Sequence, residues 1–318
     1  MFGTNRIARA VYASLTEEER QLEKLALTIP GFETREQMEK ERLYRIKAIR
    51  KAVRQNRNDN QDESKEVRKA HKKWRGRMFR LKRKLEGCMP EHQCGSAACP
   101  QCFRLHRLRK LTELLPLRAS KGAYRVVTLV YYDAMLKEDE ISRWDHKKFR
   151  ERVYKMIKRA GFTGKIVGDY ELDFHTDIQR WMPHLHLLMP REPGALKTLR
   201  KAMKRDKNMR ARAGIISRPM KSQKLKDFDE QVTYCFKGMW LEVRPYPDEA
   251  GKRRTPKHRL PPVLLARALC KQDEMGFTGL TFTSGVNRPG FPGECFICEL
   301  RLPDHRFRWK HNKLFLLL

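Results

Sequence analysis

The stretch Gly168–Met189, GDYELDFHTDIQRWMPHLHLLM, decides the fold, and the other segments are interpreted relative to it. Near its end, His184 and His186 are separated by a single leucine. In a β-strand, residues i and i+2 point to the same face, so the two imidazoles would stand side by side. Neutral imidazoles in such a pair are natural ligands for a divalent metal ion.

Acidic residues upstream share this period of two: Asp169, Glu171 and Asp173. A hairpin turning through His175–Trp181 would lay their strand antiparallel to the histidine strand and place a carboxylate beside the imidazoles. Two histidines and one carboxylate leave coordination positions open, which suits a catalytic metal ion. The alternative for such a strand is a pair of half-buried histidines that bind no metal.

Positive charge dominates the composition of this chain of 318 residues. It has 70 Lys+Arg against 38 Asp+Glu, a formal net charge of +32 and a pI near 10.1. Such an excess attracts polyanions, and nucleic acid is the partner that we expect. The sequence shows no long apolar segment and no secretory h-region, so we expect no membrane partner and a cytoplasmic location.

Four cysteines lie close together in the first third of the chain: Cys88, Cys94, Cys99 and Cys102. Four thiolates at this spacing can close a tetrahedral site, and in a reducing compartment the pattern favours metal over disulfides. We therefore predict a structural Zn²⁺ site. His92 and His106 are substitutes if Cys88 is not a ligand, and four unrelated free thiols are the alternative.

A second cysteine pair lies near the C-terminus. Cys295 and Cys298 resemble half of a zinc site. The residues that would complete it are Cys270, His305 and His311.

The sequence predicts an α+β protein in four segments. Residues 1–87 form a basic helical arm, with capping-box patterns at Thr16 and Thr34 and a polar break at 56–64. This arm either contacts phosphates or is simply solvated. Residues 88–120 hold the cysteine knuckle and a basic helix. The core, 121–243, has an antiparallel central sheet with flanking helices, and 244–318 form an extension whose Pro- and Arg-rich part, 244–262, we expect to be irregular.

Within the core, the expected order is a strand at 124–132, a helix at 144–160 and strands at 165–173 and 184–189. A short helix follows within 227–240. Tyr234 and Lys237 are three residues apart in it, so they share a face if the segment is helical.

These elements resemble the HUH endonuclease superfamily, specifically the rolling-circle replication initiators of bacterial plasmids. The strand YRVVTLVYY (124–132), with Thr128-Leu129-Val130, is similar to the family's first motif. PHLHLLM (183–189) is similar to the second, and TYCFKG (233–238) to the third, a tyrosine with a lysine three residues on. CGSAACPQC (94–102) is similar to a cysteine knuckle that precedes the nuclease core in several plasmid initiators. The likeness covers about residues 88 to 240.

The resemblance implies a catalytic metal site. His184 and His186 would bind Mg²⁺ or Mn²⁺, with Glu171 as the third ligand and Asp173 as its rival. Members of this group often have a further histidine two residues before the pair, where this chain has Met182.

The resemblance also implies a reaction. Tyr234 would be the nucleophile, and Lys237 would orient the tyrosine or the phosphate. The chain would nick single-stranded or extruded origin DNA through a 5′-phosphotyrosine and later rejoin it, with a host helicase and polymerase as further partners. The alternatives are a single-tyrosine transposase or relaxase, and a non-catalytic zinc protein that binds nucleic acid.

Overall fold

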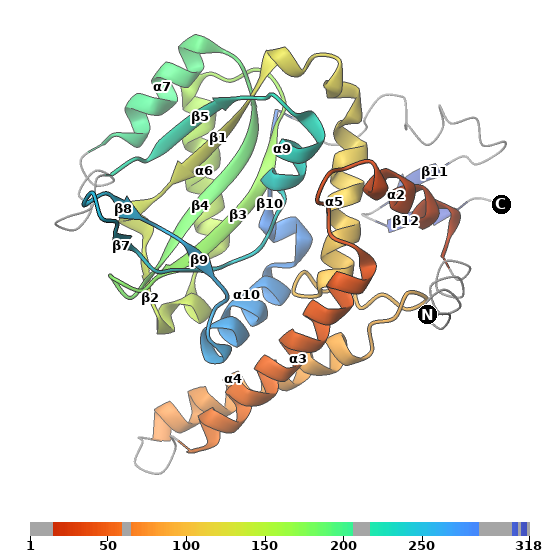
Figure 1. The fold of residues 1–318 in the computed structure, drawn as a ribbon, viewed down its shortest axis with the longest axis vertical. Coiled ribbons are helices and arrows are strands. Elements are labelled where there is room, and N and C mark those ends of the chain that lie inside the picture. The colour runs from red at the N-terminus through yellow and green to blue at the C-terminus, as the bar shows by residue number, and fades with distance from the viewer. Residues whose placement is uncertain (1–14, 59–64, 206–216, 286–306, 311–312, 317–318) are drawn as a thin grey trace.

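The computed structural model describes residues 15–58, 65–205, 217–285, 307–310 and 313–316, and its fold is α+β (Figure 1). The helices are α2 (Glu17–Leu27), α3 (Arg35–Asn58), α4 (Lys65–Glu86), α5 (Pro100–Leu114), α6 (His146–Ala160), α7 (Pro193–Met203), α9 (Phe228–Cys235) and α10 (Pro262–Leu280). Short 3-10 helices lie at Leu115–Arg118, Lys121–Ala123, Tyr132–Ala134 and Asp139–Arg143. The strands are β1 (Tyr124–Val130), β2 (Leu136–Lys137), β3 (Ile166–His175), β4 (Arg180–Pro190), β5 (Met220–Lys224), β6 (Glu242–Val243), β7 (Tyr246–Pro247), β8 (Arg253–Arg254), β9 (Lys257–His258), β10 (Thr281–Ser284), β11 (Phe307–Lys310) and β12 (Lys313–Leu316).

The central sheet has the order β5-β1-β4-β3-β6-β9, with β10 also paired to β3 and β2 to β4. The prediction of an antiparallel sheet is correct for all of these pairs except one, because β6 runs parallel to β3. The chain passes through β4, β5 and α9 before it returns beside the C-terminal end of β3 in the same direction. The sheet is therefore mixed.

The predicted hairpin is formed by β3 and β4. Glu171 lies opposite His184, and Asp169 lies opposite His186. At Gly168 the two strands approach so closely that a Cβ would lie 1.9 Å from the carbonyl oxygen of His186, so glycine is required there. This register brings the carboxylate strand beside the histidine strand.

Alternation along the hairpin gives the sheet two different faces. Tyr170, Leu172, Leu185 and Leu187 belong to the core cluster that also includes residues of α6, α7 and α10. The intervening residues, including the histidines, point to the opposite face, where α5 and α9 pack. The hydrophobic cores on both faces thus fix the position of the polar side chains.

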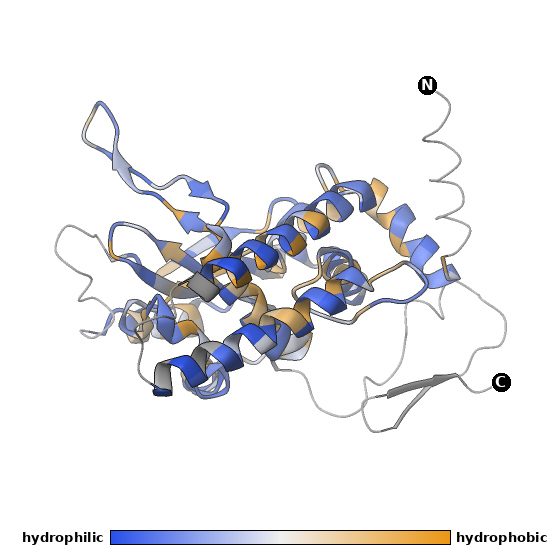
Figure 2. Cartoon of the chain, turned by 90° about the horizontal axis from the view of Figure 1, so that it is seen from below, coloured by the Kyte–Doolittle hydropathy of each residue, from blue (hydrophilic) through white to orange (hydrophobic). Residues whose placement is uncertain are grey.

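The N-terminal helices pack against the body of the protein. Both predicted capping boxes form, at Thr16 and at Thr34. Helices α3 and α4 lie side by side and contact α10 (Figure 1). Their ribbons alternate hydrophobic and hydrophilic bands, as amphipathic helices do (Figure 2). Buried side chains such as Ile49 and Met78 belong to the main core cluster, so the described part of the arm helps to build that core.

The segment after residue 243 differs from the sequence prediction. Residues 244–262, expected to be irregular, contain β7, β8 and β9, and β9 joins the central sheet. Helix α10 and strand β10 follow, and β10 pairs with β3, so the sheet extends beyond the predicted 121–243 core. Strands of two residues are too short to show an alternating pattern, which is why the sequence does not reveal them. Among the described residues, none of the helices combines the length and apolarity that a membrane span requires.

Candidate active site

Three side chains from the β3–β4 hairpin form a compact polar group: Glu171, His184 and His186. One ligand atom from each lies within 4.8 Å of the others, and all three residues are buried. The Oε2 atom of Glu171 is 3.3 Å from Nε2 of His184 and 3.6 Å from Nε2 of His186. The sequence prediction of one carboxylate beside two imidazoles is confirmed in this geometry.

Each imidazole is oriented through its other ring nitrogen. Nδ1 of His184 lies 3.1 Å from the carbonyl oxygen of Met182 and donates to it. Nδ1 of His186 lies 3.0 Å from the hydroxyl of Thr128, which is directly opposite on β1. Both Nε2 atoms therefore face Glu171. Metal-binding histidines are commonly oriented in this way, by a hydrogen bond at the ring nitrogen that does not bind the metal.

The group can hold a metal ion. Both carboxylate oxygens of Glu171 and Nε2 of His186 are buried, and they have no hydrogen-bond partner among the described residues. Buried polar atoms are seldom left unpartnered, because the loss of solvation costs free energy. Burial opposes the ionisation of Glu171, but the two imidazoles outweigh it and hold its pKa well below the usual value. A carboxylate and two imidazole nitrogens form a donor set that suits a divalent ion.

Asp173, the rival third ligand, has other partners. Its Oδ1 accepts a hydrogen bond of 2.9 Å from the amide of Leu241. Its Oδ2 lies 2.6 Å from Nζ of Lys257. The distance from Oδ2 to Nε2 of His184 is longer, 3.8 Å. The structure therefore brings Glu171 into the metal-binding group and ties Asp173 to a lysine.

Tyr234 lies beside this group. Its ring is 4.8 Å from the ring of His186, centre to centre, and the residue is 43% exposed. The ammonium of Lys237 is 5.7 Å from the tyrosine ring centre, although α9 ends at Cys235 and Lys237 follows it. Burial and the nearby Glu171 raise the pKa of Tyr234, so the phenol stays protonated at neutral pH.

Helix α9 is held firmly where it presents this tyrosine. Asp227 caps its N-terminus through a side-chain hydrogen bond. Arg118 forms an ion pair of 2.5 Å with Asp229, and Arg107 donates to the carbonyl oxygen of Thr233 at 3.2 Å. These contacts link α9 to α5 and to the segment after it, and they limit the freedom of the tyrosine.

Lys257 is a candidate functional residue that the sequence does not reveal. It is on β9, and about a third of its side chain, 35%, is exposed. Burial opposes its charge, but Asp173 and Glu171 outweigh that effect and raise the pKa of Lys257. Its positive charge also lowers the pKa of Tyr234, against the larger effect of burial. Only the pairing of β9 with β6 places this lysine, so a local sequence pattern could not have found it.

The predicted cysteine cluster also forms. Its four sulfur atoms lie within 4.8 Å of one another, and together they could hold a metal ion. The Sγ–Sγ distances are 3.5 Å from Cys99 to Cys88 and 3.7 Å from Cys102 to both Cys88 and Cys94. Contacts with Cys102, then with Cys94 and Cys99, hold the pKa of Cys88 far below its usual value. Among the described residues, neither His92 nor His106 is part of this cysteine cluster.

The second cysteine pair, Cys295 and Cys298, lies outside the described residues, as do His305 and His311. Cys270 is described, and it is buried on α10 as a free thiol.

No family model matches the chain, and neither does any curated protein or solved structure with which it was compared.

Proposed function

We propose that the protein is a metal-dependent DNA nickase that uses a tyrosine nucleophile and initiates rolling-circle replication of a plasmid. The observation that carries this proposal is the 4.8 Å separation between the rings of Tyr234 and His186. A partly exposed tyrosine thus stands against a buried group of one carboxylate and two imidazoles. A phenol beside a metal-binding group suits the cleavage of a phosphodiester, which resists attack without charge stabilisation.

Glu171, His184 and His186 would hold Mg²⁺ or Mn²⁺ in this proposal. An ion bound there would polarise the scissile phosphate and stabilise the charge that develops on it. Tyr234 would attack phosphorus through its Oη atom, which gives up its proton. The bond from phosphorus to the 3′ oxygen breaks, the 3′ oxygen gains a proton, and the 5′ side stays on the tyrosine as a phosphodiester. The later attack of a 3′-hydroxyl reverses these steps and rejoins the strand.

The lysines near Tyr234 have a role in this reaction. Lys237 lies 5.7 Å from the centre of the Tyr234 ring, and the charge of Lys257 acts on the same tyrosine. A cation at that place favours the tyrosinate, whose formation burial opposes. It would also bind the phosphate itself.

The charge distribution supports DNA as the partner. The chain has a net charge of +32, and exposed cations such as Lys72, Arg80 and Arg83 line α4. Contacts between such cations and phosphates release counterions, so affinity should fall steeply as salt rises. This helix would add sequence-independent affinity away from the nucleophile. A structural Zn²⁺ in the cysteine cluster would fix the C-terminal end of α4, which Cys88 follows.

The test is incubation of the purified full chain with labelled circular single-stranded DNA that carries the candidate origin, in Mn²⁺ or in EDTA, followed by a denaturing gel. We expect a covalent protein–DNA adduct in Mn²⁺ only, and none from Tyr234→Phe. Tyr132→Phe is the control, because Tyr132 follows β1 and is not part of the group. An adduct that persists in Tyr234→Phe would refute the nucleophile.

The same assay, run also on the ends of a mobile element and on a transfer origin, separates the alternatives. A single-tyrosine transposase or relaxase would form the same adduct, but on the ends of a mobile element or on a transfer origin. A non-catalytic zinc protein would bind the DNA and leave it intact in every metal tested.

A further inference from the structure

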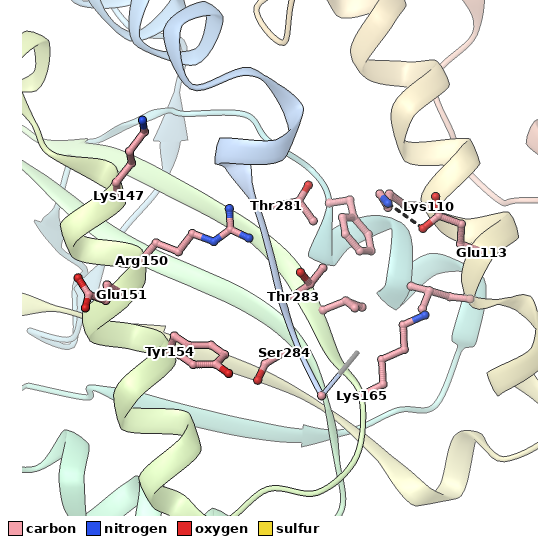
Figure 3. Close-up of a pocket in the computed structure, with 14 residues that line it drawn as sticks. Lys110, Glu113, Lys147, Arg150, Glu151, Tyr154, Lys165, Thr281, Thr283 and Ser284 are labelled. Carbon is pink, nitrogen blue, oxygen red and sulfur yellow. Dashed lines mark hydrogen bonds and ion pairs between the residues drawn. The ribbon is translucent and has the colours of Figure 1, made fainter. Parts of the chain in front are cut away.

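A cavity of about 710 Å³ lies at the open edge of β10, between α5 and α6 (Figure 3). Within the described part of the chain, β10 pairs with β3 alone, so its other edge faces this cavity. None of the metal-binding residues lines it, and neither does Tyr234. We call it the edge pocket. Its volume is in the range typical of small-molecule sites.

Cations come to the edge pocket from two sides. Lys147, Arg150 and Tyr154 are spaced i, i+3 and i+7 on α6, so they share one helical face. Figure 3 shows Arg150 and Tyr154 reaching from α6 toward β10. Lys110 on α5 and Lys165 at the start of β3 lie on the other side. The lining carries four cationic side chains against two carboxylates, which favours an anion.

The positive charges are only partly balanced. Lys110 forms an ion pair of 2.7 Å with Glu113, and Arg150 donates to the carbonyl oxygen of Thr278 at 2.7 Å. The side-chain ammonium of Lys147 makes no hydrogen bond or ion pair with the described residues. Burial lowers the pKa of Lys165, and the charge of Lys110 lowers it further, against the effect of Glu113. A bound anion would relieve this excess of positive charge.

The rest of the lining suits a planar aromatic group. Leu114, Val167 and Phe236 give an apolar patch, and all three are buried. Tyr154 is 43% exposed and offers a ring for stacking. The hydroxyls of Thr283 and Ser284 can accept or donate hydrogen bonds at the edge of such a group. One cavity thus combines a surface for a base with cations for phosphate.

From this combination we infer that the edge pocket binds a phosphorylated nucleoside, either as a free nucleotide or as one residue of a single strand. The base would lie against the apolar patch and Tyr154, and the phosphates would lie against Lys147 and Arg150 of α6. This inference goes beyond the proposed nicking activity and does not depend on it. A cavity with an apolar patch fits a nucleotide better than an acidic peptide, which needs an extended groove.

The test measures binding by the full chain, without cleavage, to two probes: a fluorescent ATP analogue and a labelled oligothymidylate. Lys147→Glu should weaken binding about tenfold, a loss of about 1.4 kcal/mol. Lys148→Glu is the matched control, because Lys148 is the next residue, is exposed, makes the same charge change and does not line the pocket. It should change affinity less than about twofold, as expected for an exposed charge that does not line the pocket.

The two probes identify the source of the nucleotide. Weaker binding of the ATP analogue by Lys147→Glu indicates a free nucleotide, and an effect on the oligothymidylate alone indicates a strand. Tyr154→Ala should weaken the same probe, and adenosine should compete much less well than ATP because it lacks phosphate. Equal losses in Lys147→Glu and Lys148→Glu would mean that only net charge matters, and would overturn the inference. Equal competition by oligoglutamate would overturn it too, in favour of an acidic peptide.

Discussion

The ammonium of Lys257 lies 2.6 Å from the carboxylate of Asp173. This ion pair joins β9 to β3, whose residues are far apart in sequence, and it holds a cation next to the metal-binding group. The amide of Leu241 donates to the same carboxylate, so Asp173 is fixed from two sides. Asp173 thereby positions Lys257 and is not part of the group that could hold a metal ion.

We expect Lys257→Gln to slow adduct formation by about tenfold or more, as the loss of a charge stabiliser does at other active sites. The reason is that Lys257 lowers the pKa of Tyr234, which burial raises. The measurement is the rate of adduct formation at saturating DNA and Mn²⁺. Lys252→Gln, at an exposed position in the turn between β7 and β8, should keep the parent rate. Equal rates for the two variants would remove Lys257 from the proposed reaction.

A second prediction separates Glu171 from Asp173 as metal ligands. Mn²⁺ at a hundredfold excess over its Kd should stabilise the parent protein by about 2.7 kcal/mol, and so raise its Tm by several degrees. Glu171→Gln should abolish this rise, because it removes the one anionic ligand of the group. Asp173→Asn should keep most of it, because Asp173 is paired with Lys257 and lies outside the group that could hold the ion. Loss of the rise in Asp173→Asn alone would exchange the two roles.

A third prediction concerns the cysteine cluster, which ties several helices together. Cys88 follows α4, and Cys99 and Cys102 lie at the start of α5. Next to them, Arg45 of α3 donates to the carbonyl oxygen of Ala98 at 2.9 Å. If Zn²⁺ occupies the cluster, Cys102→Ser should lose one zinc per chain and lower the Tm markedly.

Elemental analysis and thermal unfolding check this outcome. Cys270→Ser is the control, because Cys270 is also buried but lies outside the cluster. It should lose stability without losing zinc. Full zinc content in Cys102→Ser would show that the cluster is not the zinc site.

Local sequence patterns predicted much of this site. The period of two in β3 and β4 predicted a carboxylate beside the two imidazoles, and the register that puts Glu171 opposite His184 agrees with it. Capping boxes and the Gly161 that ends α6 marked helix boundaries correctly. The short spacing of the cysteines was likewise sufficient to indicate their cluster.

What the sequence could not supply depends on long-range pairing. The parallel contact of β6 with β3 and the reach of β9 to Asp173 arise from two-residue strands, which have no readable period. The sequence left the choice between Glu171 and Asp173 open for the same reason: both have the right parity, and the partners that hold Asp173, Leu241 and Lys257, are distant in sequence. Helix α10 was missed although it packs against α3 and completes the core.

The last prediction concerns acid sensitivity. His106 stacks on Phe277 with ring centres 4.4 Å apart, and burial, with smaller effects of Lys110 and Arg109, lowers its pKa to about 3. In the unfolded chain its pKa is about 6.5, so between these values the unfolded state binds more protons. The free energy of unfolding should therefore fall as pH drops below 6.5, by about 2 kcal/mol at pH 5 from this residue.

His106→Phe keeps an aromatic ring on Phe277 but cannot be protonated. Urea unfolding of parent and variant at pH 7 and pH 5 tests its contribution. The loss of stability between the two pH values should be about 2 kcal/mol smaller in the variant. The lost contact with Thr281, 3.3 Å from Nε2, lowers stability at both pH values and cancels in this difference. His258→Phe, at an exposed position on β9, should keep the parent's pH dependence. An equal loss in parent and His106→Phe would show that the His106 imidazole does not set the acid response.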